Sequence, residues 1–293
     1  MNEAVAGAVA IAMPVACRLC GGPASVFASR EDLSLLRCRV CGFVSGIPAR
    51  LQPAAEQYRH YYEAEIPAAP DRRYEEWLAE AEGKVGRGRL LEVGAGSGAF
   101  SRAARRRGWS VDATEVSASG LRLLRETGAT VHAGDLSALR LPAAAFDLVV
   151  SLEVVEHLAE PGAHLEELGR LTRPGGHLLL TTPNFGGLSR RLLGMRWRVI
   201  DPEHLGYFTA ATLRRALERA GFTRVSVRPR TLDVTTWRSA LRGKEPPRFD
   251  PHSAAAARDR LDGSWVLSAA KDAVNALLRV TRLGDTLLAW AAR

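Results

Sequence analysis

The sequence predicts a doubly wound α/β domain with a mostly parallel sheet, attached to a small cysteine module. From residue 89 onward, apolar runs of strand length alternate with longer amphipathic segments, a pattern typical of βα units. The first of these runs ends directly in a glycine-rich loop. All four cysteines lie between residues 17 and 41. The 293 residues suffice for one α/β core and small accessory modules.

The expected elements follow in order along the chain. Strands are predicted at 90–93, 110–114, 130–133, 147–151 and 177–181, and helices at 100–107, 117–127 and 162–171. A helix at 210–220 and a strand at 222–227 come next, because Thr209 is a suitable N-cap and Gly221 a suitable C-terminal stop. The domain plan is a disordered leader at 1–16, the cysteine module at 17–46, a helical lid or linker at 47–84, the α/β domain at 85–238, and a linker with C-terminal amphipathic helices at 239–293, including a helical segment at 265–290.

The composition predicts a basic protein without a membrane-spanning segment. The formal net charge is +8, which suits an anionic partner such as RNA, a phosphorylated substrate or a membrane surface. A compositional bias toward arginine competes with that explanation, because only Lys84, Lys244 and Lys271 are lysines. No apolar run reaches the roughly 18 residues that a spanning helix needs, and residues 4–16 lack the basic start of a secretory signal, so we expect a cytoplasmic protein.

The cysteine spacing predicts a structural zinc site. The pairs Cys17-x2-Cys20 and Cys38-x2-Cys41 are separated by seventeen residues, and each pair is followed by glycine. Four thiolates at this spacing are typical of a zinc ribbon, a module too small to form its own core. A closed shell of four sulfurs leaves no position open for catalysis. Two disulfides are the alternative, although a reducing compartment disfavours them.

Three successive predicted strands end in groups suited to a nucleoside ligand. The first ends in Gly94, Gly96 and Gly98, spaced G-x-G-x-G, which differs from the dinucleotide fingerprint and argues against NAD. The second ends in Glu115, about 20 residues on, where a carboxylate can accept from ribose hydroxyls. The third ends near Asp135, where a carboxylate can accept from an adenine amine. Each group alone is a weak signal, and a helix cap would explain either acid.

The ordered motifs resemble those of class I S-adenosylmethionine-dependent methyltransferases. They comprise the run 90–100 with Glu115 and Asp135, the block 146–158 and the block 171–180. The resemblance covers residues 85–230 and implies a Rossmann-like, seven-stranded, mostly parallel sheet. Within the family, the motifs Pro-Glu-His-Leu at 202–205 and Phe-Thr at 208–209 resemble the small-molecule branch that includes ubiquinone-pathway O-methyltransferases.

The resemblance also implies roles for individual residues. The three glycines would pass under the methionine part of the cofactor and Glu115 would hold its ribose, and Glu92 belongs to the same set. Asp135 and Leu136 would border the adenine, and Glu153 would lie beside the sulfonium.

Two chemistries are open for activating the acceptor. His157 is a candidate general base, beside Glu153. On a helix, Glu153, Glu156 and His157 would share one face, and with His204 they are similar to an E-x-x-E-H pattern that binds a divalent metal such as Mg²⁺ in related enzymes. The alternative is a structural role without chemistry, in which His157 orders a loop and the two glutamates are solvated.

Further features bear on the acceptor and on partners. Related enzymes that methylate the amino nitrogen of a base bind it with an Asn or Asp followed by two prolines and an aromatic residue. Here Ser151, Leu152 and Glu153 stand at that place, which favours an oxygen or carbon of a small metabolite as the methyl acceptor. Arginines at 188–200 could bind phosphate or carboxylate. That segment and 265–290 could instead rest on a membrane or form a homodimer interface. The competing functions are a zinc-ribbon RNA methyltransferase and a non-catalytic cofactor-binding protein.

Overall fold

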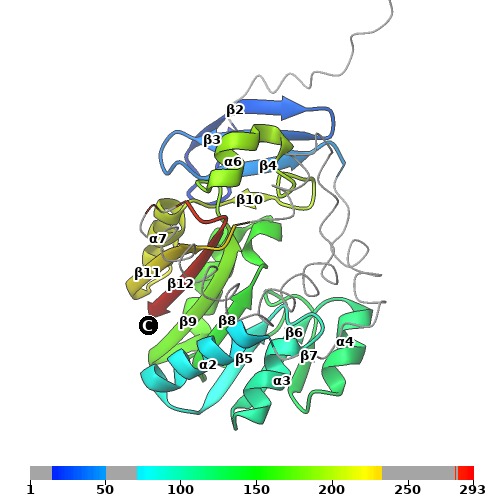
Figure 1. Ribbon diagram of the computed structural model, residues 1–293, viewed down its shortest axis with the longest axis vertical. Helices are drawn as coiled ribbons and strands as arrows, with labels where there is room; N and C mark the ends of the chain where they lie inside the picture. The colour runs from blue at the N-terminus through cyan, green and yellow to red at the C-terminus, as the bar shows by residue number, and fades with distance from the viewer. Residues whose placement is uncertain (1–14, 51–70, 233–280, 282) are drawn as a thin grey trace, which may run out of the picture.

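The structure consists of two sheets that lie end to end (Figure 1). It is a computed structural model that describes residues 15–50, 71–232, 281 and 283–293. A seven-stranded sheet forms the larger part, and a five-stranded sheet built mainly from the cysteine module lies against one end of it. No helix in the described residues is long and apolar enough to cross a membrane.

The seven-stranded sheet confirms the predicted α/β fold. Its strand order is β11-β12-β9-β8-β5-β6-β7, in which β12 runs antiparallel to both of its neighbours, β9 and β11, and the other six strands run in the same direction. The order reverses between β5 and β8, and ligands of such sheets bind at the carboxyl ends beside that reversal. The strands are β5 Arg89–Val93, β6 Ser110–Glu115, β7 Thr130–Ala133, β8 Phe146–Leu152, β9 Thr172–Pro183, β11 Thr223–Arg230 and β12 Thr286–Ala292.

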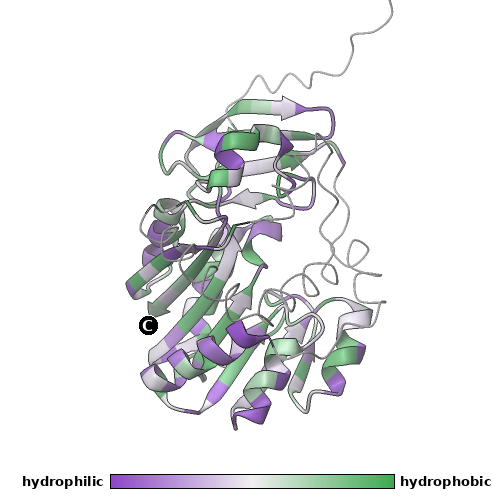
Figure 2. Cartoon of the chain, viewed as in Figure 1, coloured by the Kyte–Doolittle hydropathy of each residue, from purple (hydrophilic) through white to green (hydrophobic). Residues whose placement is uncertain are grey.

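Helices cover both faces of this sheet because its strands are apolar on both sides. On β5, Leu90 packs with Trp77 and Phe100 of α2 and α3, whereas Leu91 packs with Leu165 and other residues of α5 and α7. Figure 2 shows apolar residues along β8 and β9 and polar residues on the outer surfaces of α2 and α3. The helices are α2 Arg72–Val85, α3 Ala99–Arg106, α4 Ala118–Arg125, α5 Pro161–Leu171 and α7 Ala210–Arg219.

The C-terminal prediction was wrong for residues 286–290. Residues 286–290, expected in a helix, belong to β12, which lies between β9 and β11 in the sheet. Leu287 and Ala289 face one core and Leu288 and Trp290 the other, so the strand has no polar alternation to distinguish it from a buried helix. The rest of the expected helix, up to residue 280, lies outside the described residues.

The cysteine module forms the second sheet together with a strand from the α/β domain. Its order is β1-β2-β3-β4-β10, with β1 Val15–Ala16, β2 Pro23–Arg30, β3 Leu33–Cys38, β4 Val44–Pro48 and β10 Gly206–Tyr207. We call this sheet with its cysteine loops the ribbon. Phe43 of the ribbon contacts Phe208, with ring centroids 4.8 Å apart, so the two sheets share a core.

The structure divides the chain differently from the domain plan at three points. Residues 15–16, expected in the leader, form β1, and helix α2, expected in the lid, packs on the seven-stranded sheet. The segment 188–200, with α6 Leu188–Leu193 and the 3₁₀ turn η2 Gly194–Arg196, covers the ribbon sheet. Trp197 and Ile200 are buried there against the ribbon, so these two apolar side chains are not on the surface.

Candidate active site

The carboxyl ends of β5, β6 and β7 are joined by hydrogen bonds. Gly96 N–H donates to Glu115 Oε2 over 2.8 Å, and Gly134 N–H donates to the Glu115 carbonyl over 2.9 Å. The other carboxylate oxygen of Glu115 accepts from the N–H groups of Val116 and Ser117. The structure therefore brings the glycine loop and Glu115 together and fixes the carboxylate of Glu115, which is 6% exposed.

The glycine loop closes against the loop that follows β8. Gly94, Gly96 and Gly98 have φ angles of 68°, 54° and 72°, in the left-handed region that glycine adopts readily. A Cβ on Gly94 would lie 2.7 Å from Cγ2 of Val154, so the close approach needs glycine. Glu153 also has a positive φ, 55°, which turns the chain immediately after β8. These two loops flank the reversal of strand order, where the fold places a ligand.

The remaining predicted cofactor residues lie at the same end of the sheet. Glu92 is buried and accepts from the Ser101 hydroxyl over 2.5 Å, and burial raises its pKa to about 7. Asp135 is exposed and accepts from Ser137 N–H and Oγ, so its carboxylate caps the turn that contains buried Leu136. The sequence left capping open as an alternative role for either acid. Asp135 has this role, and it also lies at the end of a strand.

Glu156, His157 and His204 form a cluster whose candidate ligand atoms lie within 4.8 Å of one another. Nδ1 of His157 contacts the Glu203 carbonyl at 3.1 Å, and Nδ1 of His204 contacts the Val199 carbonyl. In the tautomer that donates from Nδ1, each ring carries its lone pair on Nε2. Carbonyl contacts of this kind orient histidines that bind metals.

The predicted helix around this cluster is absent. Only a 3₁₀ turn, η1 Val155–His157, is present, so Glu153 does not share a helix face with Glu156 and His157, and it is not part of the three-residue group. Glu156 Oε2 accepts from the Thr182 hydroxyl over 2.9 Å, while Oε1 is buried with no partner among the described residues. Burial, followed by the charge of Glu153, raises the pKa of Glu156.

A family model described as a methyltransferase domain matches residues 58–227, more than half of the chain. The chain belongs to this methyltransferase family. The malonyl-[acyl-carrier protein] O-methyltransferase of Serratia marcescens is 37% identical over 53% of this chain and 62% of its own length. The ubiquinone biosynthesis O-methyltransferase of Pseudomonas aeruginosa strain LESB58 is 31% identical over 37% of this chain and 49% of its own length. The matched part thus spans about half to three fifths of these relatives.

Solved structures support the methyltransferase fold. An S-adenosylmethionine-dependent methyltransferase from Mesorhizobium loti superposes with a TM-score of 0.51, covering 77% of this chain and all of that one, at 21% identity.

Three side chains of this methyltransferase domain were missed by the sequence analysis. Ser101, Val154 and Thr182 contact Glu92, Gly94 and Glu156, respectively. Ser101 is fully buried in the short helix α3, and a small polar residue inside an apolar helix face was the signal available for it.

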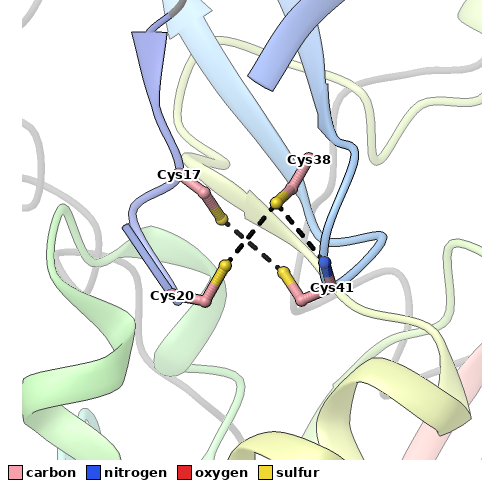
Figure 3. A group of neighbouring side chains, drawn as sticks. All are labelled: Cys17, Cys20, Cys38 and Cys41. Atoms are coloured by element: carbon pink, nitrogen blue, oxygen red, sulfur yellow. Dashed lines mark hydrogen bonds between the residues drawn. The ribbon is translucent and has the colours of Figure 1, made fainter. Parts of the chain in front are cut away.

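The four cysteines of the ribbon point toward one another (Figure 3). Sγ of Cys17 lies 3.7 Å from Sγ of Cys41, and Sγ of Cys20 lies 3.5 Å from Sγ of Cys38, distances too long for disulfides. Tetrahedral zinc with Zn–S bonds of about 2.3 Å needs sulfurs about 3.8 Å apart, so the cluster fits this ion. Backbone N–H groups of Leu19 and Val40 donate to the sulfurs at 3.4 and 3.3 Å.

Proposed function

We propose that the protein transfers the methyl group of S-adenosylmethionine to a hydroxyl oxygen of a small molecule. The observation that carries this proposal is the junction of the glycine loop, Glu115 and the Glu153 turn at the reversal of strand order. The two curated relatives described above are O-methyltransferases, which supports an oxygen acceptor.

The cofactor would lie across the carboxyl ends of β5, β6 and β7. The glycine loop would pass under its methionine part, Glu115 would accept from the ribose hydroxyls, and Asp135 and Leu136 would border the adenine. Glu92 would not contact the cofactor but would fix the start of α3 by accepting from the Ser101 hydroxyl. Glu153, on its strained turn after β8, would lie beside the sulfonium.

The reaction needs an acceptor that is held in line and deprotonated. A bond forms between the acceptor oxygen and the methyl carbon, the carbon–sulfur bond breaks, and the hydroxyl proton leaves to a base. His157 is a poor base by itself, because burial, followed by the charge of His204, lowers its pKa to about 3. A neutral imidazole suits a metal ligand better than a proton acceptor near pH 7.

We therefore propose that Glu156, His157 and His204 hold a divalent cation such as Mg²⁺. A cation there would lower the pKa of an acceptor hydroxyl. The buried Glu156 Oε1, which has no hydrogen-bond partner among the described residues, favours a positive ion at this place. Titration of the protein with Mn²⁺, followed by electron paramagnetic resonance, tests this site. His204→Ala should weaken Mn²⁺ binding more than about tenfold, whereas His132→Ala, a histidine outside the cluster, should leave it unchanged. Equal Mn²⁺ affinity in the two variants would refute the site.

The ribbon would hold one structural zinc ion through its four cysteines. Elemental analysis of the purified protein should give one zinc per chain, and this value should fall on replacing Cys41 by Ser. A full complement of zinc in that variant would contradict the four-sulfur site.

The test of the cofactor site is calorimetric titration with S-adenosylmethionine and S-adenosylhomocysteine. We expect micromolar affinity that is lost in Glu115→Ala and retained in Glu126→Ala, an exposed acid at the end of α4. Absence of binding by folded, zinc-loaded protein would refute the methyltransferase proposal. A salt-dependent shift of RNA, with no small acceptor methylated, would favour the RNA methyltransferase instead.

A further inference from the structure

Helix α6 packs on the ribbon (Figure 1), and there the charge of Arg37 on β3 acts on Arg190 of α6. Arg37 of β3 stacks on Phe27 of β2, with its guanidinium carbon 4.5 Å from the ring centroid. Arg190 of α6 stacks on Phe185 at the same distance. The two rings contact each other edge to face, with centroids 6.3 Å apart. The four side chains therefore form one group, which we call the arginine pair and its two rings.

The arginine pair has no counter-charge among the described residues. Neither Arg37 nor Arg190 takes part in a described ion pair, whereas Arg30 on the same sheet is paired with Asp32 at 2.6 Å. The Nε–H group of Arg190 is buried without a hydrogen-bond acceptor among the described residues. Burial, followed by the charge of Arg37, lowers the pKa of Arg190. An oxyanion between the two guanidinium groups would accept from the Nε–H group of Arg190 and would reduce the repulsion between the two positive charges.

A chain of packed aromatic rings connects Arg190 to the proposed site of methyl transfer. Phe185 comes two residues after the carboxyl end of β9, the strand that also provides Thr182 to Glu156. Its ring centroid is 5.5 Å from that of Tyr207, which in turn is 6.4 Å from that of His204. Phe185, on which Arg190 stacks, is thus two ring contacts from the cluster that would activate the acceptor.

We propose that Arg37 and Arg190 bind an oxyanion, a phosphate or carboxylate group, carried by the acceptor. The inference rests on the proposed function, because it assigns the pair to the acceptor of methyl transfer. Arginine is suited to this task because its planar fork donates two parallel hydrogen bonds to such groups. Binding energy from the remote anion would hold the hydroxyl in place for transfer. The ribbon then has a recognition role in addition to its zinc site, since it contributes Arg37 and Phe27.

The test uses the full chain, loaded with zinc, and titrates it with inorganic pyrophosphate and separately with succinate. One or both should bind saturably at low ionic strength, and the tighter of the two identifies the group as phosphate or carboxylate. Arg37→Gln and Arg190→Gln should each weaken binding about tenfold or more. Arg125→Gln, an exposed arginine in the last turn of α4, makes the same change of charge and should leave it within about twofold.

Arg190→Lys is a conservative control for misfolding, because it keeps the positive charge but lacks the planar guanidinium. We expect its affinity for the anion to lie between those of the wild type and Arg190→Gln. S-adenosylmethionine affinity, measured on the same samples, should stay constant in all variants. Failure of both anions to bind, or equal binding by wild type and the two Gln variants, would overturn the proposal. If the cofactor does not bind but pyrophosphate does so through both arginines, the anion site stands and the methyltransferase proposal fails.

Discussion

Replacement of Gly94 by alanine tests whether the glycine loop and the loop after β8 form one tightly packed site. The left-handed backbone at φ 68° costs an L-residue about 1–2 kcal/mol. The new Cβ would lie 2.7 Å from Cγ2 of Val154, a stiff β-branched side chain, and such overpacking costs a further 1–3 kcal/mol, roughly. We therefore expect Gly94→Ala to lower the free energy of unfolding by about 2–5 kcal/mol.

The assay is urea denaturation without cofactor, together with calorimetric titration of S-adenosylmethionine. Gly108→Ala is the matched control, because Gly108 also has a positive φ, 89°, but its Cβ would meet nothing closer than 4.0 Å. It should cost only the backbone strain. In a Val154→Ala background, Gly94→Ala should cost no more than Gly108→Ala does. The reasoning fails if the two glycine variants are equally stable in the wild-type background, or if Val154→Ala restores nothing.

Three further predictions concern stability. Burial raises the pKa of Glu92 from 4.5 to about 7. Its contribution to the free energy of unfolding is therefore fully present below about pH 4.5 and is lost as the pH rises through 7. In paired urea titrations between pH 5 and 8, Glu92→Gln should thus become more stable than the wild type, by at most about 3 kcal/mol. Removal of zinc by a chelator should lower Tm in scanning fluorimetry, because the ribbon shares a core with the larger sheet, and Cys41→Ser should show no additional loss. Asp285→Ala should destabilise the protein by about 1–3 kcal/mol, since it removes acceptors for Ser189 N–H and Oγ; Asp285→Asn, which keeps one oxygen, should cost less.

The parallel core was predictable because its signals are local. The strand at 130–133 has the expected bounds, and the helix at 210–220 begins at Ala210 after the Thr209 cap. Glycine spacing and acids after strands depend on chain order alone, so Gly96 and Glu115 could be assigned to the same end of the sheet before their hydrogen bond was known. Cysteine spacing worked in the same way.

The elements that were missed depend on contacts between distant parts of the chain. β12 is a strand because β9 and β11 leave a gap between them, and its residues, apolar on both faces, carry no period of their own. β10 is two residues long and exists because Ser45 and Val44 of the ribbon pair with it. The chain turns at Glu153, which has a positive φ, and places Val154 against Gly94 of the glycine loop, a contact with a distant part of the chain that the helical periodicity of this segment does not reveal.

The last strand of the chain also explains how α6 holds Arg190 beside the ribbon. Asp285, immediately before β12, is buried, and its carboxylate accepts from the backbone N–H and hydroxyl of Ser189. A Cβ on Gly187 would lie 2.7 Å from that carboxylate, so the start of α6 is closely fitted to it. The segment before β12 and the start of α6 are therefore linked by buried polar contacts, whereas the 188–200 segment packs on the ribbon through apolar side chains. If Arg190 binds the acceptor, Asp285→Ala should weaken pyrophosphate binding as well as stability, although Asp285 lies on a different element and is buried.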